Sequence, residues 1–540
     1  MTAFLSKSCL SALLFCAFSV CGPHAQEAAP AKAEEQLSTA ARIGVRAFRF
    51  EGNTVFSSAQ LGEVVREYAD REVSSDELEE ARRKLSQFYV DRGYVNSGAL
   101  LRDQSIRDGI ITWSIVEGKL TGVQINGRRR FRSTFLQSQI APDTEKPLNV
   151  LTLRDRLQLL RQNPNIKSIN ADVRPGLRPG EATLQVELVE NKPDSFSLEF
   201  DNHRAPSVGA ERVRLVYNNR NLLGLDDSLT LRTGLTRDDL DFANPARLGD
   251  FAASYQSPAF GRDTRLVASY SKGDSAVIEE PFRALGISSE SENYALGLRQ
   301  PLRRTLNEDV SVSATLEHRK SESFLFGLPF SFSLGDVNGV SETTAIRFGV
   351  ESLQRGQSSV LASRALLSYG NNFPGSTRNA VAPGGKFMTL LGQVQHVRVL
   401  DEKGRQLVLR LDGQWADKPL LSVEKFSIGG ASSVRGYREN QLVRDKGFAA
   451  SAEVRVPLLR NKLGAERLTL APFFDFGAGK NKGAVATAGQ STLSSLGVGL
   501  LYTDNRLNAQ VYYGHALKSI NTADNDLQDK GIHFGLSFRL

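Results

Sequence analysis

The segment Ile532-His533-Phe534-Gly535-Leu536-Ser537-Phe538-Arg539-Leu540 shows most clearly the residue pattern from which the fold class is predicted. Large apolar residues occupy every second position, and smaller or polar residues lie between them. Because successive side chains of a β-strand point to opposite faces, this alternation predicts a strand with one apolar face and one polar face.

The same alternation recurs upstream as far as residue 192. Clear examples are Leu229 to Leu235, Phe251 to Tyr255, Leu266 to Tyr270 and Val310 to Leu316. Segments of about ten residues recur roughly sixteen times, an even number that is typical of bacterial outer-membrane barrels. The polar face is rich in Arg, Glu, Ser and Gly. These residues suit a polar lumen inside a closed sheet that faces lipid outside, so residues 192–540 are predicted to form a transmembrane β-barrel.

Two smaller modules precede the predicted barrel. Residues 43–120 show the order strand, two helices, two strands, and residues 121–191 repeat it about 75 residues later, as in a tandem repeat of α+β modules. Short strands at the edge of such modules can pair with an extended peptide. The alternative is that the modules are inert spacers.

The first module carries the clearest helix signal. Ser74 and Glu77 form a capping box at its start, and Gly93 ends it. The expected buried stripe is Leu78, Ala81, Leu85 and Phe88. Strands are then expected at Tyr94 to Leu101 and at Ile110 to Val116.

Residues 1–25 resemble a secretory signal peptide, with Lys7 before an apolar core. All three cysteines, Cys9, Cys16 and Cys21, lie in this segment, so the mature chain is expected to lack thiols; a lipid anchor on Cys21 is the less favoured alternative. Residues 26–42 form an arm that could be a short helix or disordered.

Composition excludes several classes of function. The net charge of +7 is spread along the chain without a basic block, which gives no support to nucleic-acid binding. No internal run approaches the roughly 18–20 apolar residues of a membrane-spanning helix. Five histidines remain after the signal segment, without a nucleophile motif, which argues against an outer-membrane enzyme, and no metal or cofactor is expected. They are His203, His318, His396, His515 and His533.

The candidate site is a glycine-rich loop, Ile428-Gly429-Gly430-Ala431-Ser432-Ser433-Val434-Arg435-Gly436-Tyr437. Gly429 and Gly430 give the backbone freedom to fold back as a hinge, which would bring Arg435 into a confined space. About forty residues later, Asp475 alternates with Phe474 and Phe476, whose face must meet lipid, so Asp475 is predicted to point into the lumen. We therefore expect an Arg435–Asp475 ion pair. The alternatives are a solvated surface arginine and an aspartate solvated in a water-filled lumen.

These features together resemble the TpsB family of two-partner secretion transporters, the haemolysin secretion/activation type. The signal peptide, two modules like polypeptide-transport-associated (POTRA) domains, about sixteen strands and Val434-Arg435-Gly436-Tyr437 between the eleventh and twelfth strands carry the resemblance, as does Asn221-Leu222-Leu223-Gly224-Leu225. In that family the sixth extracellular loop folds into the pore, and its arginine pairs with an aspartate of a strand motif, which match Arg435 and Asp475. The family usually ends in an aromatic residue, whereas this chain ends in Leu540.

The resemblance implies an outer-membrane translocator with periplasmic POTRA domains. Its partners would be an unfolded secreted TpsA-type exoprotein, outer-membrane lipid and, during biogenesis, the barrel-assembly machinery. No nucleotide-binding glycine loop is visible, so folding of the partner outside would drive transport. A barrel-insertion factor of the same superfamily is the alternative, but it usually carries more modules. A passive porin would have no use for two of them.

Overall fold

The computed structural model describes residues 37, 42–106, 108–141, 144–236, 249–260, 263–380, 383–460, 466–483, 490–520 and 526–540. The predicted signal peptide and almost all of the arm at 26–42 lie outside these residues. Among the described helices, none is long and apolar enough to cross a membrane. The chain divides after Gly118 into two compact units.

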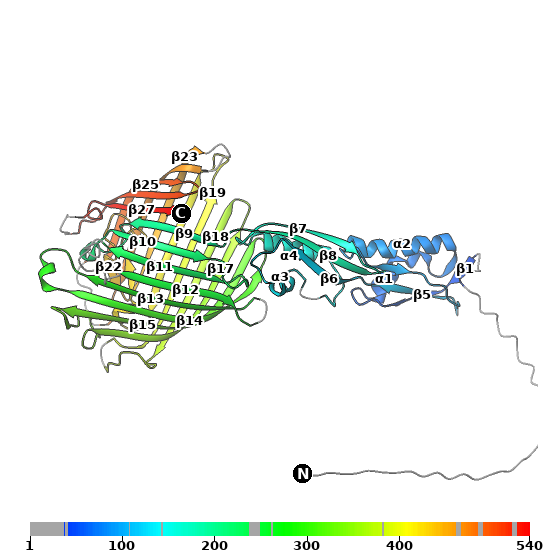
Figure 1. Cartoon of the computed structure of the whole chain (residues 1–540), viewed down its shortest axis with the longest axis horizontal. Coiled ribbons are helices and arrows are strands. Elements are labelled where there is room, and N and C mark those ends of the chain that lie inside the picture. Colours follow the sequence, from blue (N-terminus) through cyan, green and yellow to red (C-terminus); the bar gives the residue numbers. More distant parts are fainter. Residues whose placement is uncertain are drawn as a thin grey trace, which may run out of the picture. The chain divides into compact units, whose positions relative to one another are not determined.

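The first unit is a small α+β module (Figure 1). Its elements are β1 (Arg42–Val45), β2 (Ala47–Glu51), α1 (Ser58–Val64), η1 (Arg66–Tyr68), β3 (Arg71–Ser74), α2 (Ser75–Asp91), β4 (Gly98–Leu100) and β5 (Ile110–Val116). Strand β5 is central in a three-stranded sheet, parallel to β2 and antiparallel to β4, and β1 pairs with β3.

The capping box of α2 is confirmed. The Ser74 hydroxyl accepts from the Glu77 N–H, and the Ser74 N–H donates to Glu77 Oε2 at 2.8 Å. The buried stripe differs in its last member, which is Tyr89 rather than Phe88. Tyr89 lies four residues after Leu85 and therefore on the same buried face of the helix. Its hydroxyl donates to Glu117 Oε1 at 2.9 Å.

Glu117 ties this helix to the turn before α1. Burial opposes ionisation of Glu117, but hydrogen bonds from Thr54, Val55 and Tyr89 outweigh it and lower the pKa of the carboxyl group.

The predicted strand from Tyr94 to Leu101 is shorter than expected. The Tyr94 N–H bonds to the Tyr89 carbonyl, so the chain turns before it reaches β4.

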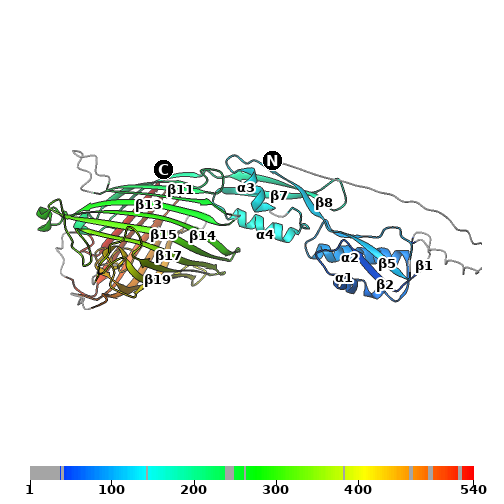
Figure 2. The same ribbon diagram turned by 90° about the horizontal axis from the view of Figure 1, so that it is seen from below.

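The second unit begins with a module of the same design, visible beside the barrel strands in Figure 2. Its elements are β6 (Lys119–Asn126), α3 (Ser133–Ile140), α4 (Val150–Arg161), β7 (Ile166–Pro175) and β8 (Glu181–Glu190). The central strand is again the last one, with β6 parallel and β7 antiparallel to it. The repeat predicted from the sequence is therefore a repeat of topology.

A closed antiparallel barrel follows (Figure 1). Its strands are β9 (Asp194–Asp201), β10 (Arg212–Asn219), β11 (Ser228–Thr236), β12 (Asp250–Pro258), β13 (Arg265–Ala276), β14 (Ser288–Arg304), β15 (Glu308–Leu325), β17 (Val340–Arg355), β18 (Ser359–Asn371), β19 (Lys386–Val399), β20 (Gln406–Ala416), β23 (Lys446–Arg460), β24 (Glu466–Lys480), β25 (Thr492–Thr503), β26 (Leu507–Ala516) and β27 (Ile532–Arg539). Each pairs with the next, and β27 closes on β9, so the described residues form sixteen barrel strands. The two-residue β16 (Leu328–Pro329) only extends the hairpin after β15.

Alternation gives the barrel its two faces, as predicted. On β24, Phe474 is 49% exposed on the outer face, whereas Asp475 is fully buried beside it. On β27, Leu536 and Phe538 are exposed and His533 is buried. The strands vary in length more than predicted, since β14 and β15 have 17 and 18 residues.

Candidate functional site

The loop between β20 and β23, residues 417–445, is not a solvated surface loop; we refer to it as the pore loop. It contains η5 (Ser422–Glu424), β21 (Phe426–Ile428) and β22 (Leu442–Arg444), and β21 pairs with β22. Ile428 and Val434 are fully buried, and Tyr437 is nearly so. These apolar side chains pack against Ala449 of β23 and Leu493 of β25, so the loop lies against the inner wall of the barrel.

Arg435 projects from the tip of the pore loop onto the barrel wall. Its Nε donates to Asp475 Oδ2 at 2.8 Å and its Nη2 to Asp475 Oδ1 at 2.9 Å, the bidentate geometry that a guanidinium offers a carboxylate. The Arg435 backbone N–H adds a third bond to Asp475 at 3.0 Å. Arg435 is 5% exposed and Asp475 is 0% exposed, so both charges are removed from bulk water.

Two further wall residues complete the environment of this guanidinium. Arg435 Nη1 donates to Glu453 Oε2 at 2.5 Å, and Nη2 donates to Ser451 Oγ at 3.0 Å. The Phe473 and Tyr512 rings lie 3.6 and 4.6 Å from the guanidinium carbon, within cation–π range. One arginine is therefore bound by two carboxylates beside two aromatic rings, and each of its three side-chain nitrogens donates at least one hydrogen bond.

Sequence reasoning missed Glu453 and Ser451. Strand β23 pairs with β24 in a register that sets Ser451 opposite Asp475 and Glu453 opposite Phe473. The alternation along β23 was the available signal, because it places both residues on the lumenal face. Their approach to Arg435 depends on the register, which the sequence alone does not specify.

The backbone of the motif fits closely against the wall. Gly436 has φ +89°, and a Cβ there would lie 2.6 Å from the Gly514 carbonyl oxygen of β26. Any larger residue would push the tip of the pore loop off the wall. The hinge glycines Gly429 and Gly430 have φ values of +113° and +95°, a conformation that glycine adopts readily. Tyr437 donates its hydroxyl to the Ser494 carbonyl at 2.8 Å.

A second set of buried contacts, at Glu424, anchors the N-terminal part of the pore loop. Glu424 in η5 accepts from Arg347 Nη2 of β17 at 2.8 Å and from the Thr343 hydroxyl at 2.8 Å. Glu317 of β15 also pairs with Arg347. Glu424 and Arg347 are each 5% exposed, so this contact is as buried as the Arg435 contact, but it joins the loop to a different part of the wall.

A third anchor follows the motif. Arg438 donates to Glu279 Oε1 in the loop after β13 at 2.8 Å and to Asp529 Oδ1 in the loop after β26 at 2.5 Å. No pattern in the sequence predicts these long-range partners. The pore loop thus contacts β15 and β17, β23 and β24, and the loops after β13 and β26.

Polar cavities lie beside the pore loop. One of about 340 Å³ is lined by Arg435, Glu453, Tyr512 and Arg410, and another of about 680 Å³ is lined by Arg299, Glu351 and Arg364 among others. In the described residues no group of three or more His, Cys, Asp and Glu side chains could hold a metal ion. The site can bind and hold a loop, and its donors are already used for that.

The end of the barrel that carries the turn after β10 contacts the second module. The turn after β10 carries Asp226, which accepts from Asn163 Nδ2 at 2.7 Å and pairs with Arg265 of β13 at 2.7 Å. A Cβ at Gly224 in this turn would lie 2.4 Å from the Arg130 carbonyl, so the turn fits tightly against the module. The segment Asn221 to Leu225 therefore lies at the junction between the barrel and the second module.

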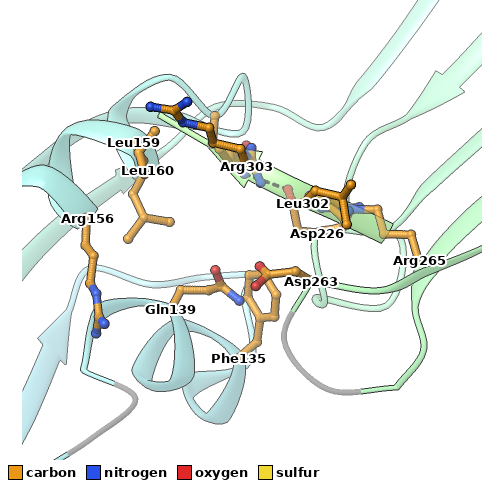
Figure 3. A pocket seen from close by; sticks show the side chains of 13 residues that line it. Phe135, Gln139, Arg156, Leu159, Leu160, Asp226, Asp263, Arg265, Leu302 and Arg303 are labelled. Atoms are coloured by element: carbon orange, nitrogen blue, oxygen red, sulfur yellow. Dashed lines mark hydrogen bonds and ion pairs between the residues drawn. The ribbon is translucent and has the colours of Figure 1, made fainter. Parts of the chain in front are cut away.

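A pocket of about 270 Å³ opens beside that junction. In Figure 3, Phe135 of α3 and Arg156 of α4 lie across from Leu302 of β14. Its lining combines apolar side chains with arginines and two aspartates, Asp226 and Asp263, at the end of the barrel that joins the module.

Comparisons with known proteins agree with this architecture. A model of the haemolysin secretion/activation protein family ShlB/FhaC/HecB matches residues 180–502, and a model of the ShlB-type POTRA domain matches residues 43–118. The heme/hemopexin transporter protein HuxB of Haemophilus influenzae (strain 86-028NP) is 24% identical over 82% of this chain and 78% of its own length. The outer membrane transporter CdiB of Dickeya dadantii (strain 3937) is 24% identical over 78% of this chain and 73% of its own length.

Solved structures support the fold. CdiB from Escherichia coli superposes with a TM-score of 0.67 at 19% identity, covering 95% of this chain and 93% of that one. BamA from Haemophilus ducreyi, in a form lacking POTRA domains 1–3, gives a TM-score of 0.56 at 14% identity over 92% of this chain and all of that one. Since the family model spans more than half of the chain, this outer-membrane transporter belongs to the haemolysin secretion/activation protein family ShlB/FhaC/HecB.

Proposed function

We propose that this chain exports one unfolded, secreted partner polypeptide of the TpsA type through its barrel, after capturing it in the periplasm. The observation that carries the proposal is the pore loop, which is anchored inside a closed barrel, together with the two α+β modules that precede the barrel in the chain. A passive pore has no need of either feature. The work of the chain is transport, without a catalytic step.

Capture would use main-chain pairing at exposed sheet edges. In both modules the central strand is flanked by two edge strands, β2 and β4 in the first and β6 and β7 in the second. An extended segment can add to such an edge through backbone hydrogen bonds, and this mode requires an unfolded client. The domain limits 43–120, 121–191 and 192–540 assign capture to the first two segments and passage to the third.

Gating would depend on the three anchors of the pore loop. Buried ion pairs are costly to break, because each partner is left unpaired in a poorly solvated place. With Glu424, Arg435 and Arg438 bound at once, the closed state is favoured until the client supplies competing contacts. The arm at 26–42 is a weaker candidate for the same role. Folding of the client outside would then make passage irreversible.

Other partners follow from the barrel. Its outer face would contact outer-membrane lipid, and strand β27, which carries Phe538 next to its last residue Arg539, would be read by the barrel-assembly machinery during biogenesis. Leu540 donates its N–H to the Phe196 carbonyl at 2.9 Å, so the final residue takes part in closing the barrel.

Export of the polypeptide encoded beside this gene tests the proposal. We expect the wild-type chain to release that polypeptide into the medium, Arg435→Ala to lower release, and Ser432→Ala, which changes an exposed side chain of the same loop, to leave it unchanged. Equal release from all three, with the barrel correctly assembled, would contradict the role of the loop. Failure of the wild-type chain to export any neighbouring product would contradict the function.

A further inference from the structure

The loop between β15 and β17 exposes an unusual number of large apolar side chains. Within residues 326–337 six of them are at least 44% exposed, and Phe326 and Leu328 reach 65% and 71%. The six are Phe326, Leu328, Phe330, Phe332, Leu334 and Val337. Phe282 and Leu285 of the preceding outer loop, 277–287, extend the set, because Phe326 donates its N–H to the Leu285 carbonyl at 3.1 Å. We call these eight side chains the outer apolar surface.

The backbone beneath this surface is well held. Phe326 has φ +51° in a two-residue turn with Gly327, an uncommon conformation for an aromatic residue, and it keeps the ring at the exposed tip. The Ser323 hydroxyl donates to the Phe330 carbonyl at 2.8 Å, and Asn379 Nδ2 donates to the Gly335 carbonyl at 2.7 Å. The apolar side chains are thus displayed on a fixed scaffold, at little further cost in ordering when a partner binds.

Lipid does not account for this exposure, because polar rows separate the surface from the membrane band. An aromatic row marks the upper edge of the lipid-facing region: Tyr270, Tyr294 and His318, with ring centroids 4.9 and 6.3 Å apart. The next outward-facing row along the strands is charged: Lys272, Glu292, Lys320 and Glu342. From His318 to Phe326 the chain runs a further eight residues, roughly 25 Å of extended strand.

The outer apolar surface lies next to the pore loop. A Cβ at Gly335 would be 2.9 Å from the Leu421 side chain, and Ser422 Oγ is 3.1 Å from Ser341 Oγ at the start of β17. On its other side, loop 277–287 is bound to the pore loop through Glu279 and Arg438. Both loops that carry the surface are therefore fastened to the segment that a passing polypeptide must displace.

The outer position of these loops follows from the connections. The second module leads directly into the start of β9, and it contacts the turn after β10, so that end of the barrel is periplasmic. The loops after β13, β15 and β20 lie at the opposite end of antiparallel strands. A polypeptide that leaves the lumen past the pore loop would meet the outer apolar surface first.

We propose that the outer apolar surface binds the exported polypeptide as it emerges, by holding segments with exposed apolar side chains until they fold. The inference rests on the proposed function and extends it from the lumen to the exit. Large apolar patches ringed by charge on a folded protein mark binding sites, and an unfolded chain leaving a polar lumen has apolar side chains without partners. Retention at the exit would also oppose backward sliding.

A photo-crosslinking experiment tests this binding. A p-benzoylphenylalanine residue is placed at Phe330, and at Leu517 as the matched control, an exposed apolar residue in another outer loop. The probe is the polypeptide encoded beside this gene, arrested in transit by a folded C-terminal domain. We expect an adduct with the arrested polypeptide at position 330, at least five times stronger than at 517. An adduct with lipopolysaccharide or with a second copy of this chain, in place of the polypeptide, would overturn the proposal.

A second variant asks whether the binding matters for export. Phe326→Ser, Leu328→Ser, Phe330→Ser and Phe332→Ser are combined; because all four side chains are exposed, the barrel should assemble normally. We expect release of folded polypeptide to fall at least threefold while segments still reach the cell surface, where added protease cuts them. Release equal to wild type would overturn the proposal. If the wild-type chain exports nothing, the proposed function fails, and this inference fails with it.

Discussion

Removing the charge of Arg435 tests whether the pore loop is held by a desolvated ion pair. Three of its N–H groups bind Asp475, and a fourth binds Glu453, at distances of 2.5–3.0 Å. Breaking a buried pair costs about 3–5 kcal/mol, whereas exposed pairs contribute about 0–1 kcal/mol. With Asp475 fully buried, the first range applies. Without Arg435, two carboxylates would also remain close together in the wall.

A double-mutant cycle isolates the pair from other effects of each change. Arg435→Met keeps the side chain long and apolar, and Asp475→Asn keeps the shape of the carboxylate. We expect a coupling energy of about 3 kcal/mol or more between the two substitutions. The matched control is Arg364→Met with Glu351→Gln, a lumenal pair with 46% and 42% side-chain exposure and an N–O distance of 3.6 Å, for which we expect about 0–1 kcal/mol.

The measurement is the free energy of unfolding of the barrel in detergent, from urea titrations. The chain has two tryptophans, Trp113 in the first module and Trp415 on β20, so a Trp113→Phe background leaves a single reporter in the barrel. A coupling below about 1 kcal/mol for Arg435 and Asp475, equal to that of the control pair, would refute a desolvated pair. The pore loop would then have to be held by its apolar packing and its other anchors.

Three further predictions concern capture, gating and pH. Deleting residues 43–118 should leave a barrel that inserts but secretes nothing, and normal secretion by that variant would rule out capture by the first module. Deleting residues 417–446 should change planar-bilayer conductance far more than deleting residues 26–42; the opposite ranking would move the gate to the arm. Because the folded-state pKa of Glu117 lies below the unfolded value, its contribution to stability is full above about pH 4.3 and disappears as the pH falls through the folded pKa. Thermal unfolding followed by Trp113 fluorescence should lose that part of its acid dependence in Glu117→Gln, and an unchanged profile would contradict the assignment.

The alternation of apolar and polar residues along the strands predicted part of the site. On β24 the period of two was enough to place Asp475 inside and Phe474 outside, because only one face of the strand is rich in large apolar residues. The glycines beside Arg435 indicated a loop that could fold back on the wall. The capping box at Ser74 was equally local, since both of its partners lie within one turn of a helix.

The remaining contacts could not be predicted, because they depend on the register between paired strands and on the conformation of loops. Glu453 reaches Arg435 because β23 pairs with β24 in one register out of several that would keep the same faces. Phe88 and Tyr89 both fit the helical period after Leu85. Tyr89 is the one that is buried, because its hydroxyl binds Glu117, and this contact could not be read from the period.

The sequence alone determined that this chain is a membrane barrel with two α+β modules, and that an arginine and an aspartate face its lumen. These properties follow from side-chain periodicity, which is a local consequence of backbone geometry. Tertiary structure decided that the pore loop is anchored three times, at Glu424, Arg435 and Arg438, and that apolar side chains collect at the exit. The partners of those anchors lie up to 159 positions away in the chain, and only closure of the barrel brings them within reach of a hydrogen bond.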